Sequence, residues 1–328
     1  MTRDRLYPLL LERKLSPRLW GGRRLQNYLH LDLPPGAEPI GEAWQVYADN
    51  TVINGSHAGK TLQQVVDESG EALLGSGGRA RSHRPFPLLA KFIDAAEKLS
   101  IQVHPDDHYA FTREVGSGFS GKAEAWLILA AEPGAAIIRG FNREVIPAEV
   151  RQAVNSGTLE HLLRAVPVQP GDVIYNPAGT VHAVGAGIFL FEIQQTSDLT
   201  YRLYDYQRRD VRGRLRELHL DKALEVADLS AVDGDRVVPV ELPDGWLRLV
   251  ACEHFIMESR RLSAASVEAS SGQSVVILTV TEGLIRLEWA EGKLTLEHGA
   301  SVVIPAALGA YALEGDGLVV RCYLPTQA

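Results

Sequence analysis

Short apolar runs, separated by turn-forming residues, make up most of the chain. Five of these runs have the length of a β-strand, and they lie at 88–93, 99–103, 125–130, 135–140 and 173–175. Further along, Ile285, Leu287 and Trp289 alternate with charged residues. Alternation with a period of two is typical of an antiparallel strand that has one buried face. The pattern therefore predicts a protein that is mainly β.

Helical periodicity is confined to a few segments between the predicted strands. We expect helices at 61–69, 146–156, 158–166 and 215–229. Gly70 and Gly157 follow the first two, and glycine is the residue that most often lies just beyond a helix C-terminus. Thr158 is a suitable N-cap for the third helix, and Pro167 would end it. The helices are thus predicted to be short insertions in a β framework.

The composition changes between residues 228 and 245, where proline, glycine and aspartate interrupt every period. We place a domain boundary there, because such a stretch is typical of a linker. This predicts a first domain at 1–235, which includes the helical insertions, and a smaller β-domain at 236–328.

One short segment of the first domain is similar in sequence to a segment of the second domain. Residues 171–178 and residues 299–306 both read as a glycine turn, a buried strand and a proline-alanine turn. In this register, His182 of the first copy corresponds to Ala310 of the second. We interpret the pair as a duplicated β-unit in which only the first copy keeps a polar site.

The composition and net charge argue against several classes of protein. The chain has 328 residues, and 33 basic against 41 acidic residues give a net charge of −8. That charge opposes general binding to nucleic acid or to an anionic membrane, so neither partner is expected. The two cysteines, Cys252 and Cys322, are too few for a secreted disulfide scaffold. The first 14 residues hold only a short apolar run, so we predict a cytoplasmic, soluble protein.

Candidate chemistry gathers on three strand-like segments of the first domain. Gln102 and His104 are two positions apart, so their side chains leave the same face of a strand, and Lys122 and Glu124 do likewise. His182 follows a Pro-Ala-Gly turn. Two imidazoles, one carboxylate and one amide oxygen would form a site for Zn²⁺ or another first-row divalent ion. Spacing alone also allows each residue to be an ordinary hydrogen-bonded strand residue.

The amino-acid sequences of several segments favour the metal site over the ordinary hydrogen-bonded strand residues. The spacing of Gly171, Pro177, Gly179 and His182 resembles the second motif of the cupin superfamily, whose fold is a double-stranded β-helix or jelly roll. Five colinear strings resemble type I phosphomannose isomerase (mannose-6-phosphate isomerase), and they lie at 41–44, 99–107, 121–126, 177–183 and 192–205. The resemblance therefore implies a metal-binding jelly roll and a second, metal-free β-domain.

The resemblance implies a role for seven residues. The metal ligands would be Gln102, His104, Glu124 and His182, and they would hold one divalent ion, here expected to be zinc. The other active-site positions fall on Lys122, Glu192 and Arg202. The implied reaction is aldose–ketose isomerisation of mannose 6-phosphate and fructose 6-phosphate through a cis-enediol(ate), so the expected partner is a small sugar phosphate.

The individual roles of Lys122, Glu192 and Arg202 are left open by the sequence. Glu192 is our first choice for the proton carrier, because the apolar run around it would raise its pKa by desolvation, and Lys122 is the alternative. Glu192 could instead be a structural strand carboxylate that is paired with a basic residue. Arg202 has a planar guanidinium suited to phosphate oxygens, but Asp198 lies on the same strand face and could hold it structurally. Lys122 is a second candidate for substrate binding.

Two functions from other classes remain as alternatives. The first is a sugar-phosphate sensor on the same scaffold, which would bind the ligand without turnover. The second is a different metal-cupin enzyme, such as an Fe(II) oxygenase. The sequence leaves open the physiological metal, the acceptance of other aldose phosphates and the oligomeric state.

Overall fold

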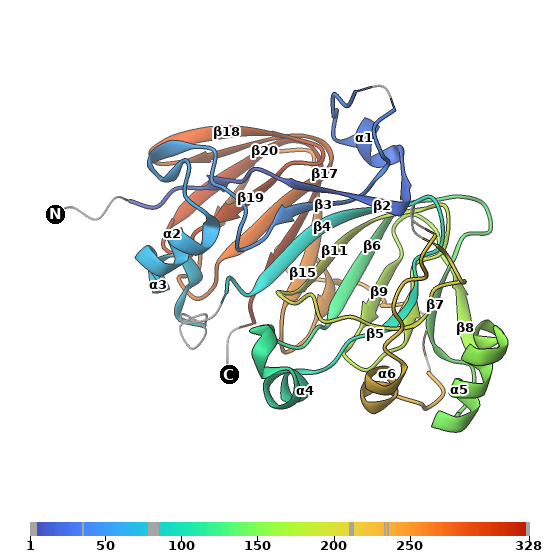
Figure 1. Ribbon diagram of the computed structural model, residues 1–328. Coiled ribbons are helices and arrows are strands. Elements are labelled where there is room, and N and C mark those ends of the chain that lie inside the picture. Colours follow the sequence, from blue (N-terminus) through green and yellow to red (C-terminus); the bar gives the residue numbers. More distant parts are fainter. Residues whose placement is uncertain are drawn as a thin grey trace.

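The computed structural model describes residues 5–34, 36–77, 85–209, 213–232, 234 and 236–325. Within these residues the chain forms three antiparallel sheets connected by short helices and loops (Figure 1). The predicted mainly-β class is therefore confirmed. None of the helices described is long and apolar enough to cross a membrane.

The central layer is a six-stranded sheet that is buried on both faces. Its strands, in spatial order, are β2 (Lys14–Gly22), β3 (Ile40–Val46), β4 (Leu88–Ala95), β11 (Ile188–Gln195), β6 (Glu124–Ala131) and β9 (Val173–Asn176). Side chains alternate between its faces, so that in β6 Ala125 and Leu127 contact the C-terminal domain, whereas Trp126 and Ile128 face the interior of the first domain. Glu124 begins the strand on the same side as Trp126, and this places its carboxylate in that interior.

A five-stranded sheet closes the other side of this interior. Its order is β12 (Tyr201–Tyr204), β5 (Ile101–Val103), β10 (His182–Ala183), β7 (Ala136–Phe141) and β8 (Leu163–Pro167). Ile137 and Val166 pack against Trp126 and Ile174 of the central sheet, so the two sheets share one core. Two facing antiparallel sheets are the arrangement expected of a jelly roll.

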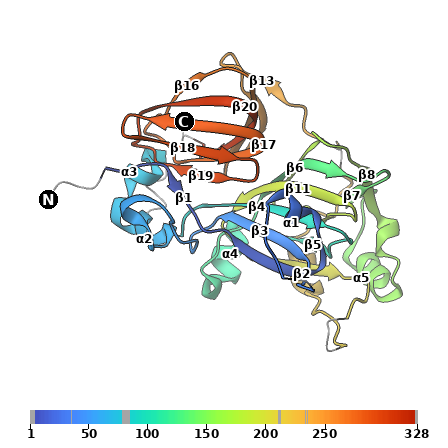
Figure 2. The same ribbon diagram turned by 90° about the horizontal axis from the view of Figure 1, so that it is seen from above.

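The C-terminal domain is built on a nine-stranded sheet, which lies above the central sheet in Figure 2. Its main order is β1 (Leu9–Leu10), β19 (Ser301–Ile304), β17 (Val276–Trp289), β20 (Ala310–Tyr323), β15 (Ile256–Leu262), β14 (Leu247–Ala251) and β13 (Val240–Glu241); β18 (Gly292–Glu297) and β16 (Ser266–Ala269) pair with β17 and β20. Because β1 pairs with β19, the N-terminal segment crosses to this sheet. The boundary at 235/236 stays a proposal.

The two echoed segments of the sequence adopt the same local structure. β9 leads through the Pro177 turn to β10, which begins at His182, and β19 leads through the Pro305 turn to β20, which begins at Ala310. Alanine therefore stands in the second domain where the first has an imidazole.

Two of the four predicted helices have the expected bounds. The six α-helices within the described residues are α1 (Arg24–Tyr28), α2 (Leu62–Ser69), α3 (Glu71–Leu74), α4 (Asp107–Arg113), α5 (Pro147–Ser156) and α6 (Leu220–Val226). At the start of α2, the Thr61 hydroxyl accepts a hydrogen bond from the Gln64 N–H, and Gln64 Oε1 accepts one from the Thr61 N–H. α5 ends at Gly157, which has a left-handed backbone with φ of 71°.

The prediction of a helix at 158–166 is wrong. A single 3₁₀ turn, Leu159–Leu162, is followed by strand β8, in which Val166 pairs with Ile137. The apolar spacing suits a helix locally, but the free edge of β7 offers backbone hydrogen bonds that the segment takes instead. The helix predicted at 215–229 forms only as α6, which is shorter.

Candidate metal centre and active site

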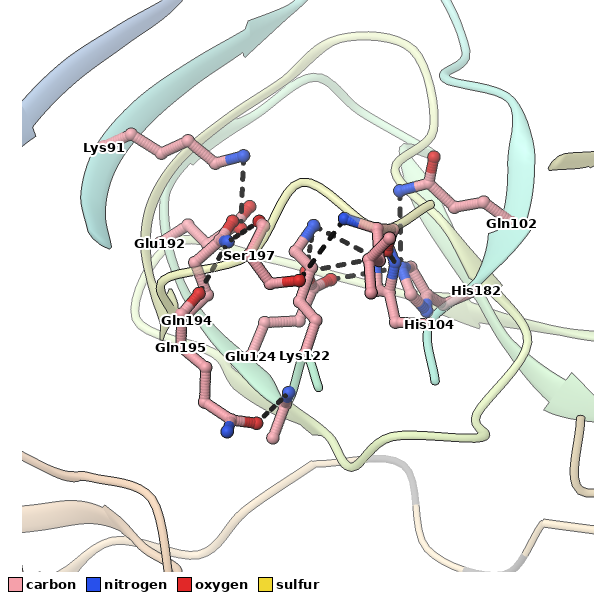
Figure 3. Close-up of polar contacts among 12 residues, drawn as sticks. Lys91, Gln102, His104, Lys122, Glu124, His182, Glu192, Gln194, Gln195 and Ser197 are labelled. Carbon is pink, nitrogen blue, oxygen red and sulfur yellow. Dashed lines mark hydrogen bonds and ion pairs between the residues drawn. The ribbon is translucent and has the colours of Figure 1, made fainter. Parts of the chain in front are cut away.

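The two facing sheets bring residues from distant parts of the sequence together. Across the five-stranded sheet, Arg202 lies opposite Gln102, and Gln102 lies opposite His182. Residues directly opposite one another in an antiparallel sheet share a face, so these three side chains belong to one row. Glu124 approaches from the central sheet, and His104 follows β5. The described structure thus collects all four predicted ligands at one end of the jelly-roll interior (Figure 3).

Three of these residues converge on a small volume that is closed to solvent. His182 Nε2 lies 3.1 Å from Glu124 Oε1, and His104 Nε2 lies 3.4 Å from Glu124 Oε2. One ligand atom from each residue lies within 4.8 Å of the others. All three residues are only 1% exposed. These residues could therefore hold a divalent metal ion, with two nitrogen ligands and a carboxylate.

Backbone carbonyls orient both imidazoles for this purpose. His104 Nδ1 lies 2.8 Å from the Leu199 carbonyl oxygen, and His182 Nδ1 lies 2.9 Å from the Thr180 carbonyl oxygen. A carbonyl oxygen only accepts, so Nδ1 carries the proton and the Nε2 lone pair faces Glu124. Such contacts to the second ring nitrogen are typical of metal-binding histidines.

The charges of the group also suit a cation. Burial and the neighbouring Lys122 ammonium lower the pKa of His104 to about 3, so its imidazole is neutral at pH 7. Burial alone would raise the pKa of Glu124, but Lys122, His182 and His104 hold it well below its usual range. The Oε2 atom of this ionised carboxylate is buried, and its charged neighbour is the Lys122 ammonium at 3.1 Å. An ionised carboxylate beside two imidazoles, of which His104 is neutral, is a donor set that fits a divalent metal ion.

Gln102 is adjacent to this group but differs from the other three predicted ligands. Its Nε2, rather than its oxygen, lies 3.5 Å from His182 Nε2, and its Oε1 accepts a hydrogen bond from the Ser100 hydroxyl at 3.4 Å. The side chain is only half-buried. A half-turn of the terminal amide would direct the oxygen toward the imidazoles, so its role as a fourth ligand stays a proposal.

Lys122 lies between the candidate ligands and the rest of the cleft. Its Nζ is 3.1 Å from both His104 Nε2 and Glu124 Oε2, although the residue precedes strand β6. It is 6% exposed. A buried ammonium at this point adds positive charge beside the metal ligands, where negative charge on a substrate oxygen would be stabilised.

Glu192 is paired with a basic residue, as the structural alternative predicted, and the pair belongs to a row of charged side chains whose other members the sequence did not identify. Lys91, directly opposite on β4, places its Nζ 3.3 Å from Glu192 Oε1 and 3.9 Å from Glu42 Oε2. Glu42 in turn forms an ion pair with Arg18, whose Nε is 2.9 Å from Glu42 Oε1. Figure 3 shows Lys91 and Glu192 on the opposite side of Lys122 from the two histidines.

The carboxyl groups of Glu192 and Glu42 have very different pKa values. Burial and the charge of Glu124 raise the pKa of Glu192 to about 7, and Lys91 and Lys122 only partly offset them. Burial would also raise the pKa of Glu42, but Lys91 and Arg18 lower it to about 2. Glu192 can therefore exchange a proton near neutral pH, whereas Glu42 remains ionised.

A cleft of about 480 Å³ joins these groups to the surface. Arg18, Arg202 and Arg216 line it together with Lys91 and Lys122. Burial and the neighbouring Arg216 lower the pKa of Arg202. An arginine stays protonated nonetheless. Arg18 is paired with Glu42 at 2.9 Å and Arg216 with Asp205 at 3.5 Å, so Arg202 is the guanidinium of the three for which no carboxylate contact within 4 Å is found among the described residues.

The alternative for Arg202, a structural pair with Asp198, is not what the structure shows. Arg202 Nε donates to the Ser100 hydroxyl at 3.2 Å, and Nη1 donates to the Glu217 carbonyl oxygen at 3.0 Å. Both partners are neutral, so the guanidinium keeps its positive charge available to the cleft.

Lys91 and Glu42 carried one signal in the sequence that was not used. Lys91 interrupts the strongly apolar strand β4, where every residue is buried, and Glu42 does the same in β3. Charged residues are almost never fully buried unless they are paired. A lysine within a buried run therefore predicts an acidic partner, although the run alone does not identify that partner.

Comparisons with known proteins agree with this architecture. The model of the phosphomannose isomerase type I catalytic domain matches residues 9–116, and the model of the mannose-6-phosphate isomerase cupin domain matches residues 246–324. A mannose-6-phosphate isomerase from Streptococcus mutans is 33% identical over 94% of this chain and 96% of its own length. Mannose-6-phosphate isomerase ManA from Bacillus subtilis is 36% identical with the same coverage.

Solved structures show the same fold. The crystal structure of the mannose 6-phosphate isomerase from Bacillus subtilis has a TM-score of 0.86 and 34% identity, and the match covers 96% of this chain and 99% of that one. A putative mannosephosphate isomerase from Archaeoglobus fulgidus has a TM-score of 0.79 at 22% identity, a likeness of fold alone. Because the identity extends over nearly the whole length of the curated relatives, the chain belongs to the type I phosphomannose isomerase family.

Proposed function

We propose that the protein interconverts mannose 6-phosphate and fructose 6-phosphate through a cis-enediol(ate), with one zinc ion per chain. The observation that carries this proposal is the buried His104, Glu124 and His182 group, of which Glu124 lines one cleft together with Lys122 and Glu192. The names of the relatives indicate the substrate pair. Two imidazoles and a carboxylate without a thiolate suit zinc as well as other first-row divalent ions, and zinc is the ion that we propose.

The reaction moves a proton between C1 and C2 and exchanges the carbonyl with the neighbouring hydroxyl. A bound divalent cation supplies Lewis-acid stabilisation of the negative charge that develops on oxygen, worth several kcal/mol. Its protein ligands would be His104, Glu124 and His182, with the Gln102 amide as the fourth. Lys122 supports the same charge with its ammonium, because it lies 3.1 Å from two of these ligands.

Glu192 is the group that we assign to the proton transfer. Its raised pKa makes it a base that can take up and return a proton near pH 7. Lys91 holds the carboxylate at 3.3 Å, so its position is fixed while its charge changes. Lys122 remains the alternative carrier, and the two assignments give different results on mutation, as argued in the Discussion.

The phosphate of the substrate would bind at the arginine end of the cleft. Arg202 is directly opposite Gln102 in the sheet, and this supports a phosphate site near the proposed metal ligands. Arg18 and Arg216 add positive charge to the same cleft. A dianionic group beside Arg202 would meet a local positive charge, even though the whole protein has a net charge of −8. The cytoplasmic location stays a prediction.

The activity is tested by a coupled assay on the purified protein before and after prolonged chelation. We expect turnover of mannose 6-phosphate that chelation removes and that stoichiometric Zn²⁺ restores, with about one zinc per chain by elemental analysis. Activity that survives complete removal of metal would contradict the metal role. Binding of the sugar phosphate without turnover would identify a sensor instead of an isomerase.

Replacing Arg202 by methionine is expected to weaken substrate binding strongly. The change removes the bidentate charge-assisted contact to phosphate, so kcat/KM should fall by about 10²-fold, mainly through KM. Competitive inhibition by inorganic phosphate should weaken in parallel. Arg209→Met is the matched control, because Arg209 is exposed and does not line the cleft. An equal effect of both variants would show that net charge, and not the site, is responsible.

A further inference from the structure

The segment Gly121–Ala123, which carries Lys122, has all three of its backbone N–H groups bound outside regular secondary structure. The Gly121 N–H donates to Asp107 Oδ1 at 2.8 Å, and the Ala123 N–H donates to Gln195 Oε1 at 2.9 Å. The Lys122 N–H donates to the Pro105 carbonyl oxygen at 2.9 Å. Two of the three partners are therefore side chains, one from the start of α4 and one from the end of β11.

These two side chains are also joined to each other. Gln195 Nε2 donates to Asp107 Oδ1 at 3.0 Å, so one carboxylate oxygen receives both the Gly121 N–H and the Gln195 amide. The Gln195 N–H donates to the Ala123 carbonyl oxygen at 3.2 Å. Gln195 thus binds Ala123 through its main chain on one side and through its side chain on the other. We call Asp107 and Gln195 the Lys122 clamp.

The local packing shows that the clamp holds the segment closely. A Cβ atom on Gly121 would lie 2.3 Å from the carbonyl carbon of Asp106 and 2.4 Å from the nitrogen of Asp107, so only glycine allows this approach. Figure 3 shows the contact of Gln195 beside Lys122. Gln195 is 3% exposed and Ala123 is 1% exposed, so water does not replace the bond between them.

The clamp is needed because the sheet does not position Lys122. β6 begins at Glu124, which has strand partners on both sides, Gln194 and Asn176. Lys122 lies two residues earlier, where this pairing has ended. Its Nζ nevertheless contacts both His104 and Glu124 at 3.1 Å. A shift of about 1 Å in such a group can cost about 10²-fold in rate.

We propose that Asp107 and Gln195 are positioning residues that act on catalysis through Lys122. The inference rests on the proposed function for its kinetic consequence, but its structural consequence can be measured without turnover. It also explains why two strings of the family resemblance, 99–107 and 192–205, contain an aspartate and a glutamine that neither the metal site nor the proton transfer uses.

The test compares Asp107→Ala and Gln195→Met with the conservative variant Asp107→Asn, in the zinc-loaded enzyme. Alanine removes the acceptor for Gly121, and methionine keeps the volume of Gln195 without its hydrogen bonds. For both we expect kcat to fall about 10- to 100-fold, with KM and the zinc affinity within about threefold of wild type. Asparagine retains the oxygen that accepts from Gly121, so Asp107→Asn should keep kcat within about threefold.

Asp106→Ala is the matched control. Asp106 is the neighbouring aspartate and the N-cap of α4, where it accepts from the Tyr109 N–H at 2.7 Å and does not bind the segment with its side chain. This variant should lower the melting temperature and leave kcat unchanged. A loss of kcat equal to that of Asp107→Ala would mean that disturbance of α4 is sufficient, and the clamp would be rejected.

A double-mutant cycle separates positioning from general damage. In a Lys122→Met background, Gln195→Met should cause almost no further loss of kcat, because the residue through which it acts is already absent. The same fold-loss in both backgrounds overturns the proposal. Crystal structures of Asp107→Ala and Gln195→Met should show Lys122 Nζ displaced from His104 and Glu124. An unmoved Lys122 would refute the clamp even if the protein proved to have another activity.

Discussion

Replacing His182 by alanine is expected to abolish metal binding and turnover together. His182 supplies one of only two imidazoles, and its Nε2 lies 3.1 Å from the Glu124 carboxylate. Loss of a residue that merely orients a ligand costs 10- to 100-fold in metal affinity, so loss of a ligand itself should cost at least about 10²-fold. Without the cation, several kcal/mol of charge stabilisation are lost, which corresponds to about 10³-fold or more in kcat. Zinc titration and the coupled assay measure the two effects.

The control for this variant is His161→Ala. His161 is exposed in the 3₁₀ turn before β8, well outside the group of candidate ligands. It should bind zinc and turn over substrate like the wild type. A His182→Ala protein that is folded, binds zinc with unchanged affinity and remains active would show that the ligand assignment is wrong.

Replacing Glu192 by glutamine is expected to stop proton transfer while leaving the metal centre intact. Glutamine has nearly the same shape but cannot take up the C–H proton, so kcat should fall by about 10²- to 10⁴-fold. Zinc content should not change, because Glu192 is not one of the His104, Glu124 and His182 group. If Glu192→Gln keeps kcat within tenfold and Lys122→Met does not, Lys122 is the proton carrier instead.

A second buried carboxylate provides the control for this change. Glu258 in the C-terminal domain is fully buried and is paired with Arg248 and Arg321. Glu258→Gln removes a comparable ion pair without contacting the cleft. It should therefore reduce the melting temperature but not kcat, which separates loss of stability from loss of chemistry.

The pH dependence has a definite sign if Glu192 is the base. The carboxylate must be ionised to accept a proton, so kcat/KM should rise with pH through the pKa of Glu192. Without a metal, burial and Glu124 raise that pKa to about 7. A nearby cation favours the ionised form, so the midpoint in the zinc-loaded enzyme should lie at or below about 7. This rise should be absent from the profile of Glu192→Gln.

Much of the candidate site could be predicted because its residues occur at short, regular spacings. The two-residue intervals between Lys122 and Glu124 and between Gln102 and His104 predict that each pair lies on one side of a strand. In the structure only Glu124 and Gln102 belong to strands, because Lys122 precedes β6 and His104 follows β5. The structure brings all of them together with His182, as the resemblance implied. The orientation of the Gln102 amide was beyond prediction, since it depends on the hydroxyl of Ser100.

Lys91 and Glu42 could not be predicted as parts of the site for a different reason. Each lies in a largely apolar run, which in β4 also contains Asp94, and the charges meet only when β4 is aligned with β11 and β3 with β4. Lys91 and Glu192 are 101 positions apart in the sequence, and a shift in register of one residue would send either side chain to the opposite face. The same dependence on a distant partner explains why 158–166 was misread as a helix.

The sequence by itself determined the alternation that separates interior from exterior in each strand, the caps of α2 and α5, and the types of ligand available. These are local properties, since a strand period or a capping box involves only residues a few positions apart. The tertiary structure alone decided which strands became neighbours, and with that the Lys91–Glu192 pair, the strand β8 and the clamp on Lys122. Such contacts depend on the register between segments up to 100 residues apart, which no local pattern encodes.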